Sequence, residues 1–518
     1  MEEKLKNSKS IQSLDFLDKI NLMTSEDVDF STDADEMKLA KKIVKNNKKN
    51  KLKKEAKNEE FVENVIYYRK RAKKLSQVKD KENSRRIRRC NKEILSKDPD
   101  FKEIYLTIDE FNNNGKKTIA YFIDSFFPVI DGVVAVLDNY AKYMQKYYNV
   151  VICAPKHKNT CYKTDKYFVL QSDAIYVKSQ GYDLAFPQLD PIFLKYISLL
   201  KIDLVHIQAP FNMGSFGLTL AKKRKIPSFS TFHSQFKQNF YNAVKSEVVA
   251  QWLTSIVMNV YKKTTYTLTM NTFARDIMKE YGLKKDVEIV PNATNLKEKD
   301  FNPEYENEIL KKHGIDKNKF NMIYIGRFVE VKNVYFIIDV ITEVYKKNPN
   351  FNFIFLGFGP EQSKMQRLIK KNGLEKIVKF TGKIDSVDEK AVIIKNSSLL
   401  FFPSVYDTDG IVKIECACYS VPTLTIEGTG VACNMKDNHN GFIEKYDKQA
   451  FVKRIEFLLK NVDFVKKVGK NAKTDLYITW EGACEILNEI YKKALNTKLL
   501  KSKNNSNKNS KKSLKNRK

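Results

Sequence analysis

Two successive series of short apolar strands, separated by helix-like segments, constrain the fold more than any other feature of the sequence. The first series begins with TIAYFI at 118–123 and ends with PSFSTF at 227–232. The second begins with NMIYIG at 321–326 and ends with VPTLTI at 421–426. Near-continuous apolar strands that alternate with amphipathic helices are typical of a parallel sheet covered on both faces. The sequence therefore predicts an α/β protein with two doubly wound domains in tandem.

Shifts in composition set the predicted boundaries. No glycine precedes Gly115 and no proline precedes Pro99, so the start of the chain lacks the residues that tight turns require. The predicted segments are a charged, helical or disordered basic extension at 1–117, a Rossmann-like domain at 118–295, a second Rossmann-like domain at 296–475, a final helix at 476–496 and a disordered basic tail at 497–518.

The net charge of the chain favours anionic partners. The sequence has 92 Lys and Arg against 62 Asp and Glu, a net charge of +30. Nucleotide phosphates, an anionic membrane surface and nucleic acid all fit this charge, and so does a role in solubility alone. No zinc-finger spacing or RNA-binding aromatic motif accompanies the charge, so no specific nucleic acid partner is expected.

Cysteine spacing and hydropathy bear on the compartment. The seven cysteines include no CxxC pair, and their odd number argues against a full disulfide framework, which favours a reducing compartment. No signal-peptide pattern and no apolar run of about 18 residues is present. We therefore expect a cytoplasmic location, with peripheral contact at the inner face of the cell membrane as an alternative.

Residues that follow the predicted strands are the candidates for ligand binding, because ligands of such sheets bind beyond the carboxyl ends of the strands. Gly132 is expected to open a helix after the first strand and to let a backbone N–H approach a phosphate. In GRFVEVKN (326–333), Arg327 and Lys332 offer a planar fork and a compact ammonium, which both suit a diphosphate. Two surface cations beside a helix are the simpler explanation of that pair.

The segment SVYDTDGIVKIECACYSVP (404–422) carries the most information. Gly410, Ile411 and Val412 are expected to form a helix N-terminus whose N–H groups hold phosphate. Asp407 precedes that helix and Glu415 lies about one turn inside it, where carboxylates accept hydrogen bonds from sugar and ribose hydroxyls. Glu415 taken alone is better explained as an ordinary first-turn acid that complements the helix dipole.

No metal site is predicted. Asp407-Thr-Asp409 matches a DxD spacing, but the same spacing recurs at Asp27 with Asp29, Asp33 with Asp35 and Asp98 with Asp100. The tandem α/β pattern also contradicts the fold in which this motif holds a cation. The five histidines contain no pair at metal-ligand spacing. Only His233, within STFHSQF, is a candidate site residue.

Taken together, these segments resemble a known family. FPVIDGV after the first strand, TFHSQF, GRFVEVK and the acid-x7-acid element that ends at Glu415 are similar to retaining glycosyltransferases of family 4, which have the GT-B fold of two Rossmann-like domains facing across a cleft. The order and spacing match over about 118–496. DLVHIQAPFNMGSFGLTLAKKRKIP (203–227) most resembles members that add glucose to diacylglycerol.

The resemblance implies a role for each candidate. Gly132 is implied to approach the donor phosphate, and His233 to contact the donor sugar. Arg327 and Lys332 are implied to neutralise the diphosphate leaving group. The residues after the fourth strand of the second domain would complete the site: Gly410, Ile411 and Val412 at the phosphate, Glu415 at the ribose, and Asp407 at the transferred sugar, where the family usually has glutamate.

The implied activity is metal-independent, retaining transfer of a hexose, by default glucose from UDP-glucose, with no cofactor. The helix at 476–496 is implied to cross back to the first domain. Lipid, polysaccharide and protein acceptors all stay open, as does a catalytically weak scaffold or binding protein. For a lipid acceptor, PIFLKYISLLK (191–201) and VVAQWLTSIVMNVYKK (248–263) are either membrane-lying helices or, more commonly for such patterns, helices that face a core.

Overall fold

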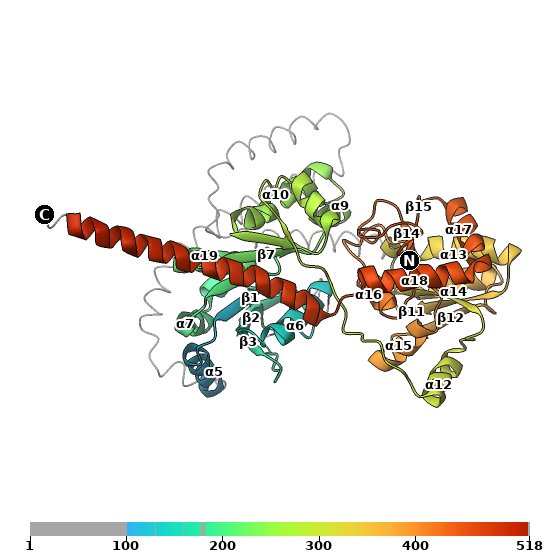
Figure 1. The fold of residues 1–518 in the computed structure, drawn as a ribbon, viewed down its shortest axis with the longest axis horizontal. Coiled ribbons are helices and arrows are strands. Elements are labelled where there is room, and N and C mark those ends of the chain that lie inside the picture. Colours follow the sequence, from blue (N-terminus) through green and yellow to red (C-terminus); the bar gives the residue numbers. More distant parts are fainter. Residues whose placement is uncertain (1–100, 130, 159, 178–181, 516–518) are drawn as a thin grey trace. The chain divides into compact units, whose positions relative to one another are not determined.

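The computed structural model describes residues 101–515 except residues 130, 159 and 178–181 (Figure 1). Most of the extension expected at 1–117 therefore lies outside the described residues. The described chain forms two compact units. The N-terminal unit contains the residues up to Leu268, Met278–Glu288 and the residues from Asn488 onward, and the C-terminal unit contains Thr269–Ile277 and Ile289–Leu487.

A seven-stranded sheet forms the centre of the N-terminal unit, with the strand order β3-β2-β1-β6-β7-β8-β9. Strand β1 pairs in parallel with both β2 and β6, so the order reverses between β1 and β6. A small antiparallel hairpin, β4–β5, stands outside this sheet. The strands are β1 (Thr118–Phe122), β2 (Asn149–Pro155), β3 (Phe168–Ser172), β4 (Ala174–Val177), β5 (Tyr182–Ala185), β6 (Leu204–Ile207), β7 (Ser228–Phe232), β8 (Tyr266–Thr269) and β9 (Glu288–Ile289).

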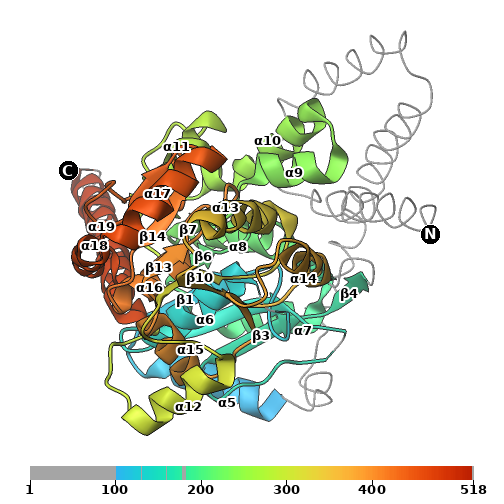
Figure 2. The ribbon, with the colours of Figure 1, turned by 90° about the vertical axis from the view of Figure 1, so that its right-hand side faces the viewer.

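Helices connect these strands, as expected for parallel neighbours. Helices α9 and α10 lie side by side in both views (Figures 1 and 2). The helices up to the second sheet are α5 (Phe101–Asn113), α6 (Gly132–Met144), the 3-10 helix η2 (Pro187–Leu189), α7 (Pro191–Leu199), α8 (Asn212–Arg224), α9 (Phe236–Val244), α10 (Glu247–Lys263) and α11 (Thr272–Glu280).

Both faces of the N-terminal sheet are covered. Successive side chains of a strand point to opposite faces, so neighbouring residues of one strand show what packs on each face. Ala120 and Phe122 belong to an apolar cluster that also contains Phe193 of α7. Tyr121 and His206 contact Tyr491 of the last helix, α19 (Trp480–Lys515). The continuous apolar runs of β1 and β6 are therefore buried on two sides.

The two apolar segments at 191–201 and 248–263, for which the sequence left a membrane-lying and a core-facing helix open, form helices that face a core. Helix α7 buries Phe193, Tyr196 and Ile197. Helix α10 buries a stripe that includes Leu253 and Val257. In the part of the chain that the structure describes, no helix combines the length and the apolar character needed to cross a membrane.

The C-terminal unit repeats the same plan with six parallel strands in the order β12-β11-β10-β13-β14-β15. Strand β10 lies between β11 and β13, so this order also reverses beside the first strand of the unit. The strands are β10 (Phe320–Ile325), β11 (Phe351–Leu356), β12 (Val378–Gly382), β13 (Leu399–Phe401), β14 (Thr423–Ile426) and β15 (Phe442–Glu444). The helices are α12 (Pro303–His313), the 3-10 helix η3 (Glu330–Lys332), α13 (Val334–Lys347), α14 (Gln362–Lys371), α15 (Val387–Lys395), α16 (Ile411–Cys418), α17 (Lys448–Lys460) and α18 (Val462–Leu476).

Helix α19 belongs to both units along the chain. Its residues up to Leu487 are part of the C-terminal unit, and those from Asn488 are part of the N-terminal unit. The helix continues to Lys515, through most of the segment 497–518 for which the sequence indicated a disordered tail. No glycine or proline follows Gly482, so the sequence contains no residue that ends the helix earlier.

Candidate active site

In the N-terminal unit, the candidate residues gather at the carboxyl ends of β1, β6 and β7, where the strand order reverses. Ser125 follows β1, Gln208 directly follows β6 and His233 directly follows β7. All three line one cavity of about 260 Å³. An open parallel sheet binds its ligands at this reversal point. The structure thus locates His233 in a ligand-sized cavity.

His233 is held in a neutral form by its surroundings. Its Nε2 lies 2.8 Å from the side-chain oxygen of Gln208, so Nε2 donates and the amide oxygen accepts. Burial lowers the pKa of His233 to about 4. A neutral imidazole in this position acts as a hydrogen-bonding group and not as a cation at pH 7.

Two polar atoms of this cavity lack a partner. Among the described residues, neither the Gln208 amide nitrogen nor the Ser125 hydroxyl has a hydrogen-bond partner, although both atoms are buried. Gln208 as a whole is 2% exposed. A buried donor without a partner costs about 1–3 kcal/mol, so each such group in a native structure requires an explanation.

Gly132 is the first residue of α6, as its position after β1 led us to expect. The N-cap residue is Asp131, and its Oδ1 accepts hydrogen bonds of 2.9 Å from the N–H groups of both Val133 and Val134. An added Cβ at Gly132 would meet no atom within 4 Å. The backbone at Gly132 is therefore open to approach, but the adjacent carboxylate already occupies the first N–H groups and opposes an anion.

In the C-terminal unit, Arg327 and Lys332 follow β10, again where the strand order reverses. Two glycines of the neighbouring loop fix the backbone around Arg327. A Cβ on Gly357 would lie 2.0 Å from the Gly326 oxygen, and one on Gly359 would lie 2.3 Å from the Phe328 oxygen. This backbone contact between loops requires glycine, and it holds the exposed Arg327 side chain on a rigid base.

Lys332 and Asp407 form an ion pair that joins the ends of β10 and β13. The Lys332 ammonium also lies 5.7 Å from the centre of the Phe402 ring. The Asp407 Oδ1 atom binds Lys332, whereas its Oδ2 is buried without a hydrogen-bond partner among the described residues. The structure therefore leaves one oxygen of Asp407 for a further donor.

The N-terminus of α16 carries the predicted phosphate-binding residues. Gly410 is the N-cap residue, Ile411 and Val412 begin the helix, and within the described chain no side chain caps this end. Glu415 lies in the same helix, where its Oε2 accepts a hydrogen bond of 2.6 Å from Lys390. The uncapped N–H groups favour an anion, in contrast with the capped end of α6.

Lys413 of α16 is a buried cation that sequence reasoning missed. Its residue is 3% exposed, and its ammonium donates to the carbonyl oxygens of Val431 (2.8 Å) and Cys433 (3.0 Å). The ammonium also lies 3.5 Å from Asp409, its i−4 neighbour. A Cβ on Gly430 would lie 2.4 Å from the backbone carbonyl oxygen of Asp407, so the loop that contains Gly430 packs directly on the segment that carries Asp407.

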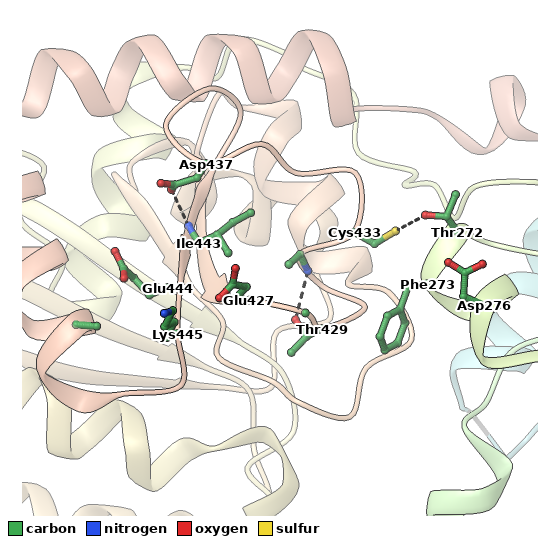
Figure 3. A pocket seen from close by; sticks show the side chains of 13 residues that line it. Thr272, Phe273, Asp276, Glu427, Thr429, Cys433, Asp437, Ile443, Glu444 and Lys445 are labelled. Carbon is green, nitrogen blue, oxygen red and sulfur yellow. Dashed lines mark hydrogen bonds between the residues drawn. The ribbon is translucent and has the colours of Figure 1, made fainter. Parts of the chain in front are cut away.

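A second cavity of about 590 Å³ in the C-terminal unit contains none of the predicted residues (Figure 3). Four carboxylates and one lysine line it: Asp276, Glu427, Asp437, Glu444 and Lys445. Such a lining opposes a diphosphate. The site residues that suit an anion are those around β10 and α16.

The two acids with the DxD spacing are both paired with lysines, Asp407 with Lys332 and Asp409 with Lys413. Within the residues that the structure describes, no group of three or more His, Cys, Asp or Glu is arranged to hold a metal ion.

The structure thus brings the predicted residues together in two sets, one in each unit. Gly132 and His233 lie at one end of the N-terminal sheet, and Arg327, Lys332, Asp407 and the start of α16 lie at one end of the C-terminal sheet. Sequence reasoning missed Gln208, Ser125, Lys390 and Lys413. The i, i+4 spacing of Asp409 and Lys413 was a signal in the sequence, but the pairing of Glu415 with Lys390 joins two separate helices and left none.

Family models match both units. The model described as Glycosyltransferase Family 4 matches residues 130–298, and the model described as Glycosyl transferases group 1 matches residues 306–475. These two matches fall on the two series of strands.

Similar proteins include two alpha-monoglucosyldiacylglycerol synthases. The protein from Acholeplasma laidlawii is 23% identical over 365 residues, which cover 68% of this chain and 91% of that protein. The protein from Streptococcus pneumoniae is 20% identical over 315 residues, which cover 59% of this chain and 70% of that protein.

Solved structures share the fold. Anabaena Alr3699/HepE, crystallised with UDP and glucose, superposes with a TM-score of 0.57 at 15% identity and covers 73% of this chain and 99% of its own. Sucrose-phosphate synthase from Thermosynechococcus elongatus gives a TM-score of 0.59 at 15% identity and covers 74% of this chain and 100% of its own. The predicted GT-B fold is thereby confirmed.

Proposed function

We propose that this chain, which belongs to the glycosyltransferases that join a Family 4 domain to a group 1 domain, transfers glucose from UDP-glucose to a lipid alcohol such as diacylglycerol. The observation that carries the donor half of the proposal is the pair Arg327 and Lys332 at the reversal point of the second sheet. The similarity to glucosyldiacylglycerol synthases supports the choice of sugar and acceptor.

The donor diphosphate is bound by positive groups of the C-terminal unit. Arg327 offers a planar fork and Lys332 a compact ammonium, and the uncapped N–H groups of Ile411 and Val412 add the partial charge of a helix N-terminus. Gly410 permits the close approach of the phosphate. No divalent cation and no cofactor are needed, because these groups supply the positive charge that a cation would otherwise bring.

The reaction retains the configuration of the sugar. The acceptor hydroxyl oxygen forms a bond to the anomeric carbon on the same face from which the leaving group departs. The bond from that carbon to the diphosphate oxygen breaks. The acceptor proton passes to a diphosphate oxygen of UDP. Arg327 and Lys332 stabilise the charge that develops on UDP. Each contributes about 2–4 kcal/mol to lowering the barrier, by analogy with an oxyanion donor.

The remaining residues orient the donor. Asp407 uses its unpartnered Oδ2 to accept a hydrogen bond from a hydroxyl of the transferred sugar, while Lys332 holds the other oxygen. Glu415, fixed by Lys390, accepts from the ribose hydroxyls. His233 contacts the donor sugar as a neutral imidazole, and the open backbone at Gly132 leaves room for the donor.

A lipid acceptor places the enzyme at a membrane surface. We infer a peripheral association with the inner face of the cell membrane, supported by the net charge of +30, which attracts anionic headgroups.

The first test is hydrolysis of a panel of nucleotide sugars in the presence of EDTA. We expect wild-type protein to hydrolyse UDP-glucose slowly and selectively, with water as the acceptor. Lys332→Ala should lower kcat by about 10²–10³-fold, and Glu415→Ala should raise KM for the donor. Lys346→Ala is the matched control, because Lys346 is an exposed lysine of the same unit whose ion pair, within the described residues, is with Glu343 on its own helix.

Loss of hydrolysis with EDTA and its recovery with a divalent cation would contradict the metal-independent mechanism. Absence of binding to every nucleotide sugar would instead favour a scaffold protein with this fold.

A further inference from the structure

The cavity of the N-terminal unit has an apolar wall. Leu184, Phe211, Phe236 and Phe240 line it, and Phe236 stacks on Phe240 with the ring centres 6.1 Å apart. Phe236 and Phe240 belong to α9, which starts three residues after His233. This wall suits hydrocarbon better than a sugar, whose carbons nearly all bear hydroxyl groups that would face aromatic rings without partners.

The charge of the cavity excludes anions. Three carboxylates line it, Asp124, Asp131 and Asp183, and none of the described lining residues is Lys or Arg. The Asp124 carboxylate is occupied by the first N–H groups of α8, with Met213 N at 2.7 Å, and Asp183 lies 2.6 Å from His157 Nδ1. His233 adds no charge at pH 7, because burial lowers its pKa to about 4. A neutral ligand is therefore favoured over a phosphate-bearing one.

Within this apolar and anion-excluding cavity, two donors are unsatisfied. The Gln208 amide nitrogen and the Ser125 hydroxyl are buried without partners among the described residues, and both residues line the cavity. The Gln208 oxygen is already engaged by His233, so the side chain cannot rotate freely to solve the deficit. A ligand with oxygen acceptors beside hydrocarbon satisfies both groups at once.

We propose that Gln208 and Ser125 are specificity-determining residues for the acceptor, and that they bind oxygen atoms next to the reacting hydroxyl of a neutral acylglycerol. This inference rests on the proposed function. The cavity has a volume of about 260 Å³. That volume fits the glycerol end of the lipid with the first atoms of its chains, and the rest of the chains extend outside the cavity.

The test compares two reactions and two acceptors. Gln208→Glu keeps the oxygen that His233 binds and removes the donor, while Gln208→Leu removes both, and Ser125→Ala removes the second donor. Each variant is assayed for UDP-glucose hydrolysis and for transfer to dioleoylglycerol and to hexadecanol in detergent micelles. Gln238→Leu is the matched control, because Gln238 lies on α9, bonds Asn242 and does not line the cavity.

We expect the two Gln208 variants and Ser125→Ala to lower kcat/KM for dioleoylglycerol at least tenfold, mainly through KM. Ser125→Ala should leave UDP-glucose hydrolysis within twofold of wild type. The penalty should disappear with hexadecanol, which has no oxygen beside its hydroxyl. Wild type should also prefer dioleoylglycerol over phosphatidylglycerol, because the cavity opposes an anion. A thermal unfolding temperature near that of wild type establishes that the variants fold.

Other outcomes overturn the inference in distinct ways. A parallel fall in UDP-glucose hydrolysis in Ser125→Ala would mean that the cavity binds the donor sugar. An equal penalty with hexadecanol would show a purely structural role, and an unchanged kcat/KM would mean that water satisfies the two donors. Donor hydrolysis without transfer to any lipid alcohol would contradict the proposed acceptor and this inference together, whereas absence of donor hydrolysis in wild type would contradict the donor half of the proposed function.

Discussion

At the scale of single residues, the site depends on which charges are paired. Lys332, Asp407 and Glu415 were recognisable by their positions after strands, but the sequence did not show that Asp407 binds Lys332 or that Glu415 binds Lys390. These pairs orient the carboxylates, since each uses one oxygen and leaves the other for a substrate hydroxyl. Lys413 has a different task, because its ammonium is buried and bonds only protein groups in the described chain.

We predict that Lys413→Met destabilises the C-terminal unit by about 3 kcal/mol, because the two carbonyl oxygens and Asp409 lose a buried charged partner. The free energy of unfolding in urea measures this loss. Lys395→Met is the control, since Lys395 forms an ion pair of 3.0 Å with Glu306 and is 33% exposed. Its loss should cost at most about 1 kcal/mol. Equal costs for the two variants would contradict the buried role of Lys413.

At the scale of elements, α19 is bound to the N-terminal sheet by a buried polar cluster. Tyr491 of α19 bonds His206 Nδ1 and lies 3.3 Å from the Tyr121 hydroxyl, while His206 Nε2 lies 2.7 Å from Thr231 Oγ1. Asn488, one turn earlier, accepts from the Tyr148 hydroxyl at 2.8 Å. The cluster specifies how this helix lies on the sheet, because each buried polar group must meet its partner.

This cluster predicts a pH dependence of stability. Burial holds the pKa of His206 well below its ordinary value of about 6.5, so the folded protein does not take up the proton that the unfolded chain binds below pH 6.5. The stability is fully present above that pH and falls as the pH decreases. His206 alone should lower the free energy of unfolding by about 1 kcal/mol between pH 7.5 and pH 5.5.

The measurement is the free energy of unfolding in urea at pH 7.5, 6.5 and 5.5. His206→Gln should lose about 1 kcal/mol less over this range than wild type, whereas the other titrating groups are common to both proteins. An identical pH dependence for the two proteins would show that His206 binds its proton in the folded state as readily as in the unfolded chain.

At the scale of the whole molecule, the chain returns to its first unit at its end. Residues of α19 up to Leu487 belong to the C-terminal unit and those from Asn488 to the N-terminal unit. The final helix is therefore part of the fold of both units, and its loss exposes Tyr121 and His206, which are fully buried in the intact chain.

We predict that truncation after residue 470 abolishes sugar transfer, because it removes Tyr491 and Asn488 from the N-terminal unit. Deletion of 497–518 should leave UDP-glucose hydrolysis nearly unchanged, because the buried contacts of α19 at Asn488, Tyr491 and Ala494 remain. Both forms are assayed for donor hydrolysis and for transfer to dioleoylglycerol. Full activity after truncation at 470 would refute the structural role of the helix.

Most central strands and the edge strand β12 were predictable from the sequence, whereas the edge strands β3, β9 and β15 were not. The runs that became β1, β2, β10 and β11 are continuous and apolar, because these strands are buried on both faces. Strands β3, β9 and β15 are end strands of their sheets, and the sequence showed no continuous apolar run at their positions. β9 has two residues and β15 three, too short to give a periodic pattern.

The sequence by itself determined the two α/β units and the positions of Arg327, Lys332 and His233 after strands, because local hydrophobic periodicity encodes both. Only the tertiary structure decided which of these groups meet. Asp131 caps the helix that begins at Gly132, and His233 binds the Gln208 oxygen, which leaves the Gln208 amide nitrogen without a partner among the described residues. Such pairings join residues from different strands and loops, and their distances depend on how the strands are ordered in the sheet, which no local pattern specifies.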